Sequence, residues 1–134
     1  MDFLFLLQSY IFELLNNNII LSKHVNGVYS YIPESALFPY VHLTGISADN
    51  LKLMLCDGYD LEVVIRAFSD ATSSKPCFNI LSTIRNLIEN YCFKIKGWSA
   101  SKIKVTKFSV AQNKHDLVWQ GDIRAKLYLL TSNA

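Results

Sequence analysis

Cysteine and histidine are the side chains in this sequence that most readily bind metals or act as nucleophiles. Their spacing supports neither chemistry: the cysteines are 21 and 15 residues apart with no CxxC pair, and no histidine has a cysteine or carboxylate at ligand spacing. The odd number of cysteines argues against a disulfide framework, and we expect buried free thiols in a reducing compartment. These residues are Cys56, Cys77, Cys92, His24, His42 and His115.

Two carboxylates, Asp57 and Asp60, flank Gly58 and form a candidate pair for acid–base catalysis. Carboxylates beside a turn are usually solvated, so we do not expect catalysis there. The sequence contains no GxxxxGK(S/T) phosphate loop, no GxGxxG dinucleotide fingerprint and no GxSxG nucleophile motif. It therefore predicts a protein that is not an enzyme, with no catalytic residue, no metal and no cofactor.

A lysine-rich segment, residues 94–114, is the clearest charge feature. It contains no acidic residue and no arginine, and three aromatic residues lie among or beside its lysines. Sites for single-stranded nucleic acid combine basic and aromatic residues in this way. Alternation with apolar residues favours a solvated strand face or the rim of a protein–protein contact, and the nucleic-acid interpretation stays open. The residues are Lys94, Lys96, Lys102, Lys104, Lys107, Lys114, Phe93, Trp98 and Phe108.

The bulk composition indicates one globular domain over residues 1–134, with 51% hydrophobic and 18% charged residues. A net charge of +2 gives no global reason to expect a polyanionic partner. The apolar N-terminus lacks basic residues and a small-residue cleavage site, and Gln8, Ser9 and Glu13 interrupt it. It is too short to span a bilayer, so we expect a cytoplasmic, unprocessed protein with no membrane partner.

Two helices are expected to position the rest of the chain. Asp2 can cap a helix that runs to about Asn16, and a second amphipathic helix is predicted over residues 76–91, with Ser74 as its N-cap. The first helix has one apolar stripe for the domain's own sheet, at Phe3, Leu7, Tyr10 and Leu14. A second stripe, at Leu4, Ile11 and Leu15, is either buried in the same core or faces a neighbouring subunit.

Five strands are predicted, over residues 28–32, 40–46, 59–68, 102–112 and 117–129. The apolar parity changes within 102–112, which predicts a β-bulge near Thr106 and Lys107. Residues 47–57 are expected to form a long loop or a hairpin extension that ends in an Asp57–Gly58 turn. The order α-β-β-β-α-β-β with short connections indicates an α+β fold: a mostly antiparallel sheet of about five strands with two helices packed on one face.

The local patterns resemble those of the tail-completion, or tail terminator, proteins of long-tailed phages and phage-derived gene transfer agents. The stretch Ala36-Leu37-Phe38-Pro39-Tyr40-Val41-His42-Leu43 is similar to the family's Pro-containing strand entry after the first helix. Residues 59–68 followed by the helix at 76–91 look like the family's strand, polar loop and long helix, and the closing strand at 121–130 also fits. Whether Pro39 is cis is left open by the sequence.

The resemblance implies a structural protein for virion assembly. Family members form a ring, commonly a homo-hexamer, that caps the head-proximal end of the tail tube, ends tube polymerisation and forms the head–tail joining surface. The implied partners are other copies of the chain, the major tail-tube protein, the head–tail connector and DNA that passes through the lumen without sequence-specific binding. The implied location is the bacterial cytoplasm during assembly and then a virion-like particle.

Two surfaces are expected to carry this function. Leu4, Ile11 and Leu15 are predicted to join subunits, and a loop containing Asp49, Asn50, Lys52 and Leu53 is predicted to contact the tail tube. Two alternatives stay open: a head–tail connector subunit of the same apparatus, and a small nucleic-acid-binding module that uses the lysines of residues 94–114.

Overall fold

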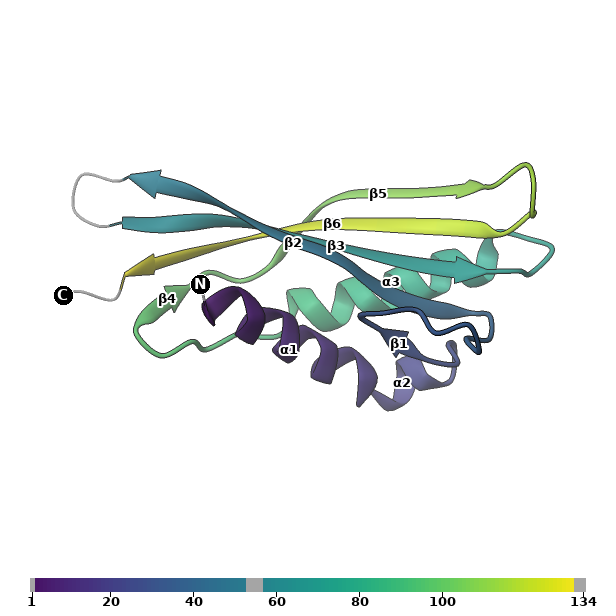
Figure 1. Ribbon diagram of the computed structural model, residues 1–134, viewed down its shortest axis with the longest axis horizontal. Coiled ribbons are helices and arrows are strands. Elements are labelled where there is room, and N and C mark those ends of the chain that lie inside the picture. Colours follow the sequence, from purple (N-terminus) through teal and green to yellow (C-terminus); the bar gives the residue numbers. More distant parts are fainter. Residues whose placement is uncertain (1, 53–56, 132–134) are drawn as a thin grey trace.

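A computed structural model describes residues 2–52 and 57–131. It contains three helices and six strands (Figure 1). In chain order these are α1 (Asp2–Asn16), α2 (Ile19–Ser22), β1 (Val28–Tyr29), β2 (Tyr40–Lys52), β3 (Asp57–Ser69), α3 (Lys75–Glu89), β4 (Trp98–Ala100), β5 (Lys104–Gln112) and β6 (Trp119–Thr131).

The six strands form one sheet in the order β1-β2-β3-β6-β4, with β5 also paired to β6. Only β1 runs parallel to its neighbour, and the other pairings are antiparallel. The predicted class, an α+β fold dominated by an antiparallel sheet, is confirmed. The predicted element order is incomplete, because the single turn of α2 and the three residues of β4 are too short to show a clear periodicity.

The region predicted as a long loop after residue 46 is mainly strand. β2 continues to Lys52 and β3 begins at Asp57, so Asp57 and Gly58 lie in a strand and not in a turn. Residues 53–56 lie outside the described part of the chain. A register shift between Leu43 and Gly45 explains the error, because it moves the inward-facing positions of β2 from odd to even numbers and hides the alternation. The alternative of a hairpin extension is the one that the structure contains.

The bulge predicted in the strand after residue 102 is confirmed. The pairing of β5 with β6 shifts between Val105 and Lys107. Beyond the shift, Phe108 pairs with the fully buried Ile123 and therefore lies on the helix-covered face of the sheet. Near the start of β2, the Phe38–Pro39 peptide bond is cis, a point that the sequence left open.

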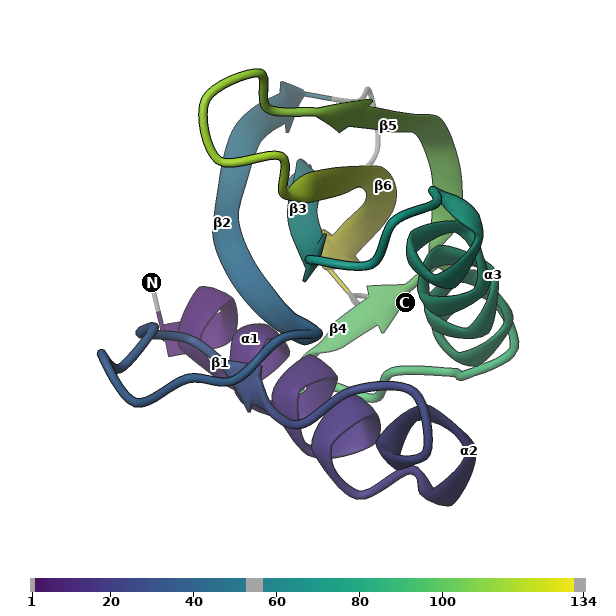
Figure 2. The same ribbon diagram turned by 90° about the vertical axis from the view of Figure 1, so that its right-hand side faces the viewer.

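The hydrophobic core lies between the curled sheet and the helices α1 and α3 (Figure 2). Apolar residues of α3 recur at helical spacing and pack against β3, β5 and β6, while α1 contacts β2 and α3. Ser74 is the N-cap residue of α3, as predicted, but its side chain makes no capping hydrogen bond. The buried residues of α3 are Cys77, Ile80, Leu81, Ile84 and Ile88.

The end of α3 is fastened to the start of β5 by Glu89. Its Oε2 accepts the backbone N–H of Val105 at 2.9 Å, and its Oε1 accepts Nε–H of Arg85 at 3.0 Å. The Val105 hydrogen bond is the main reason why the pKa of Glu89 is lowered, with a further contribution from Arg85. The carboxylate therefore stabilises the folded state in its ionised form.

We expect Glu89→Ala to lower the free energy of unfolding by about 1–2 kcal/mol at neutral pH, because it leaves a strand N–H without its partner. Since the pKa is lower in the folded state, this contribution is complete above the unfolded pKa and is lost as the pH falls through the folded value. Urea unfolding at pH 7 and at pH 3 measures the difference. Glu13→Ala, at an exposed position of α1, is the control. An equal loss for Glu89→Ala at both pH values would contradict this assignment.

Candidate assembly surfaces

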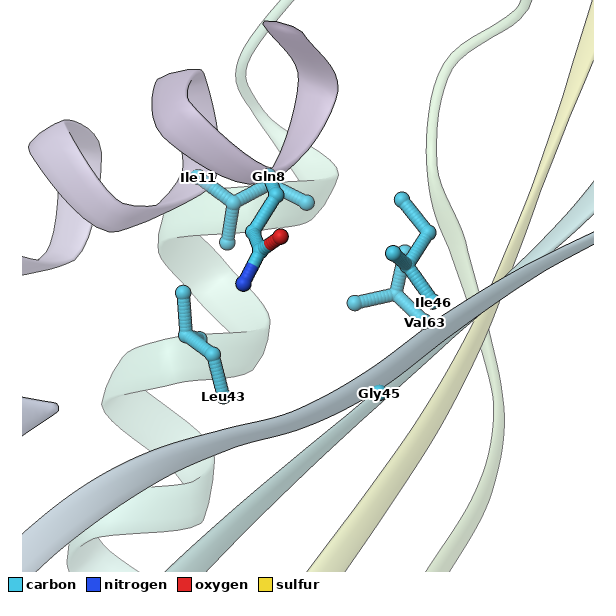
Figure 3. A pocket seen from close by; sticks show the side chains of 6 residues that line it. All are labelled: Gln8, Ile11, Leu43, Gly45, Ile46 and Val63. Carbon is cyan, nitrogen blue, oxygen red and sulfur yellow. The ribbon is translucent and has the colours of Figure 1, made fainter. Parts of the chain in front are cut away.

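The crevice between α1 and the sheet is too small to bind a substrate. Figure 3 shows the Gln8 amide pointing into it from α1, with Leu43 on one side and Ile46 and Val63 on the other. Its volume is about 10 Å³, which is room for roughly one water molecule, whereas small-molecule sites usually measure several hundred Å³. The lining residues are Gln8, Ile11, Leu43, Gly45, Ile46 and Val63.

The residues that could do chemistry are dispersed in the described part of the chain. Within residues 2–52 and 57–131, no three or more His, Cys, Asp or Glu side chains form a group that could hold a metal ion. His42 lies in β2, where its Nε2 is 3.3 Å from the Ser30 carbonyl and its Nδ1 is 3.2 Å from Thr44 Oγ1. None of the described helices is long and apolar enough to cross a membrane.

The expectation of three buried thiols is wrong for one cysteine. Cys77 is buried beneath the sheet, where loss of solvent raises its thiol pKa to about 11, but Cys92 is exposed. Cys56 lies outside the described residues. We expect iodoacetamide at pH 8 to alkylate Cys92 in the native protein and to leave Cys77 unmodified until urea is added. Peptide-resolved mass spectrometry measures both sites, and native labelling of Cys77 would contradict the burial.

The face of the sheet away from the helices carries three ion pairs between β3 and β6. These side chains alternate along each strand with the buried residues of the core, so they all project from the same face. Each pair joins an acid to a base across neighbouring strands, so most of the charge in the middle of this face is compensated. The pairs are Arg66–Asp122 at 3.1 Å, Arg124–Glu62 at 2.9 Å and Lys126–Asp60 at 3.2 Å.

The β5 side of this face is positively charged. Lys104 pairs in register with Lys126, and Lys107 pairs with Arg124, so four cationic residues lie on adjacent strands. The hydrogen bond to Asp60 raises the pKa of Lys126, which keeps that side chain protonated. Lys104 and Lys107 therefore lie next to Lys126 and Arg124, which are already paired with acids of β3.

The remaining lysines of the predicted basic surface are exposed but do not form an aromatic-lined binding site. Lys94 and Lys96 alternate with Phe93 and Ile95, both of which are buried. Trp98 packs on other rings instead of opening to solvent. Phe108 is exposed, but it lies on the helix-covered face of the sheet, whereas Lys104 and Lys107 lie on the other face. Base stacking needs open ring faces beside the basic residues, so this arrangement fits the solvated face better than the nucleic-acid alternative. Lys102 and Lys114 are likewise exposed.

The two longest unpaired strand edges among the described residues belong to β2 and β5. β1 pairs with Val41 and His42 only, so the part of β2 from Gly45 to Lys52 has no partner on its outer side. β5 pairs with β6 alone. The two edges lie on opposite sides of the sheet, as Figure 2 shows for β2 and β5. Unpaired edges offer backbone donors and acceptors to a further strand.

The residues predicted to join subunits lie mainly in the core of the chain itself. Ile11 and Leu15 are each 1% exposed, and Leu4 is partly buried against the same core. The prediction is therefore wrong for direct contacts by Ile11 and Leu15, and the alternative of a second buried stripe applies. The exposed apolar residues of α1 are instead Phe5 and Leu6, which periodicity missed because this helix is apolar on nearly all sides.

The residues predicted to contact a tail tube lie at one end of the molecule, where β2 and β3 project together (Figure 1). Asp49, Asn50 and Lys52 are exposed residues of strand β2, paired with β3, so the prediction that they form a loop is wrong. Leu53 lies outside the described residues. We call the exposed part of β2 from Ser47 to Lys52, with its β3 partners, the arm.

Comparison with known proteins finds a relative by fold only. No family model matches the sequence, and no curated protein matches it. A similar solved structure is a chain of a structure described as "Virion of native gene transfer agent (GTA) particle". The two chains superpose with a TM-score of 0.77 over 90% of this chain and 91% of that chain, at 14% sequence identity. At this identity the likeness shows a shared fold over nearly the whole length.

Proposed function

We propose that the chain is a structural subunit of a phage-like tail that caps the head-proximal end of the tail tube as a ring. The observation that carries the proposal is the full-length fold likeness to a chain of a gene transfer agent virion. The tail-terminator patterns at residues 36–43 and 59–68 support the same role.

A ring requires head-to-tail contacts between two different patches of one subunit. The unpaired edges of β2 and β5 fit this requirement because they lie on opposite sides of the sheet. The β5 edge carries Lys104 and Lys107, whereas the free part of β2 carries one acid and one base, Asp49 and Lys52, so backbone pairing is the contact that we propose. Pairing of these edges between neighbouring copies would continue the sheet around the ring, and a hexamer is the count that the resemblance implies.

In such a ring, the face with the three β3–β6 ion pairs would line the lumen. Its acids and bases compensate one another, so DNA passing through would be attracted only weakly. One rim of the ring would reproduce the stacking surface of the tube and the other would meet the connector. Tube growth would stop because the second rim offers no surface for a further tube subunit.

The arm is the part that we propose contacts the tube. We expect the double charge reversal of Asp49→Lys with Lys52→Glu to raise the protein concentration needed to stop tube growth by about tenfold or more, since interface charges set partner choice. Both residues are exposed, so folding should not change. The matched control reverses exposed charges elsewhere, at Lys23 and Asp70. Equal capping by the arm variant and the control would rule out this contact.

The function itself is tested by adding the purified protein to polymerising tail-tube subunits. We expect native mass spectrometry and negative-stain images to show a ring with a central hole, and tubes to become short with the ring at one end. Tubes that grow to the same length with and without the protein would overturn the terminator role. Binding of a ring to the connector but not to the tube would identify a head–tail connector subunit instead.

A further inference from the structure

An open groove lies between α3 and β5. Figure 2 shows these two elements on the side of the molecule opposite α1 and β2. Its volume is about 420 Å³, enough for one or two large side chains. Phe78 and Phe108 both line the groove, and their side chains are 52% and 40% exposed. The Arg85 guanidinium carbon lies 5.1 Å from the centre of the Phe108 ring. The full lining is Phe78, Leu81, Ser82, Arg85, Asn86 and Phe108.

The exposed apolar residues of α1 complement this groove. Phe5 is 71% exposed and Leu6 follows it at the surface, on a helix that packs beside β2. The sequence of α1 contains two acids and no lysine or arginine. In α3, Arg85 is ion-paired with Glu89, and Lys75 at the start of the helix is the remaining exposed base. An acidic helix with an exposed aromatic residue (the knob) therefore lies on one side of the molecule. An aromatic-lined groove lies on the other side, along a helix with one more base than acid.

We propose that Phe5 and Leu6 of one copy dock into the α3–β5 groove of a second copy. The inference rests on the proposed ring, because knob and groove are different patches on opposite sides of the molecule and can pair only head to tail. If the β2 edge of one copy pairs with the β5 edge of the next, the helices α1 and α3, which cover one face of the sheet, also become neighbours across the boundary between the copies. α1 of the first copy would then lie beside α3 of the second, and its exposed Phe5 would reach the groove.

The direct test places a photo-reactive phenylalanine analogue at position 5 and mixes copies labelled with nitrogen-14 and nitrogen-15. We expect cross-links between differently labelled copies, mapped by mass spectrometry to α3 between Phe78 and Asn86 or to β5 near Phe108. Cross-links between copies at another surface would overturn the inference. Absence of any cross-link between copies at the highest concentration that stays in solution would do the same.

A substitution tests the energetic role. Phe5→Asp is expected to weaken subunit association by about tenfold or more, because a central aromatic anchor is lost and a charge is placed against apolar rings. The control Ile19→Asp, at a residue 72% exposed on α2, should associate like the original chain. Thermal unfolding of both variants should match that of the original chain, since neither side chain lies in the core.

The tube assay separates this inference from the proposed function. If Phe5→Asp rings form and stop tube growth as the original chain does, the docking is wrong and the terminator role stands. If the original chain has no effect on tubes, the terminator role fails. The cross-linking result then still decides whether the knob and groove of two copies meet.

Discussion

Replacing Gly121 with valine is expected to lower the free energy of unfolding by about 3 kcal/mol. A Cβ atom at Gly121 in β6 would lie 2.8 Å from Cys77 Sγ and 2.9 Å from Leu81 Cδ1, closer than side chains pack. Both neighbours are buried where α3 rests on the sheet, so they cannot swing away into solvent. Overpacking of this kind costs about 3 kcal/mol or more for a branched side chain. That is a large share of the roughly 5–15 kcal/mol that holds a domain together.

Urea unfolding of the variant measures this loss, and two further variants identify its cause. Gly45→Val is the matched control, because no atom lies within 4 Å of a Cβ placed there, and it should change stability by no more than about 0.5 kcal/mol. The double variant Gly121→Val with Leu81→Ala should be more stable, by about 1 kcal/mol or more, than the sum of the two single losses predicts, because the smaller side chain at position 81 leaves space for the valine. Additive losses in the double variant would show that the close approach is not the cause.

Replacing Phe3 with alanine is expected to lower the free energy of unfolding by about 3 kcal/mol, the usual cost of truncating a buried aromatic residue. The Phe3 ring packs on Tyr59 of β3 and Trp98 of β4, with ring centres 4.7 and 5.4 Å away. Tyr59 and Trp98 are themselves 5.6 Å apart, so the three rings form one cluster. This cluster fastens the first turn of α1 to the base of the arm.

Phe5→Ala provides the contrast, two residues further along the same helix. Its side chain is exposed, so the free energy of unfolding should change by less than about 0.5 kcal/mol, while association of subunits should weaken. Thermal unfolding together with native mass spectrometry on both variants measures the two properties. The assignment of one phenylalanine to the core and the other to assembly fails if Phe5→Ala unfolds as easily as Phe3→Ala.

The elements that the sequence predicts well are those with a long, uninterrupted period. β3 alternates buried and partly exposed residues over most of its length, and α3 shows a clear apolar stripe, so both were predicted within a few residues. The parity change in β5 was visible because apolar residues flank the bulge on both sides. In β2 the residue after the shift is Gly45, which carries no side chain to mark the new face, and the strand was cut short.

The candidate surfaces were harder to predict for a related reason. α1 is apolar on nearly every side, so spacing alone could not separate Ile11 in the core from Phe5 at the surface. The groove between α3 and β5 joins residues about 30 positions apart, and only the bulge in β5 turns Phe108 toward α3. Edge charges could be read from the sequence, but which edges stay unpaired depends on the strand order.

The position of β6 has a consequence for how the chain folds. β6 comes last among the described strands, yet it lies inside the sheet, where it pairs with β3 on one side and with β4 and β5 on the other. During synthesis, β3 therefore has one unpaired side until β6 is made, and β4 and β5 have no partner strand at all. Cooperative folding begins only once residues 119–131 have emerged from the ribosome. Because β3 and β6 are far apart in the sequence, their pairing predicts a slow folding step. A chain truncated before β6 could not build this sheet, because β3, β4 and β5 would all lack the strand that joins them.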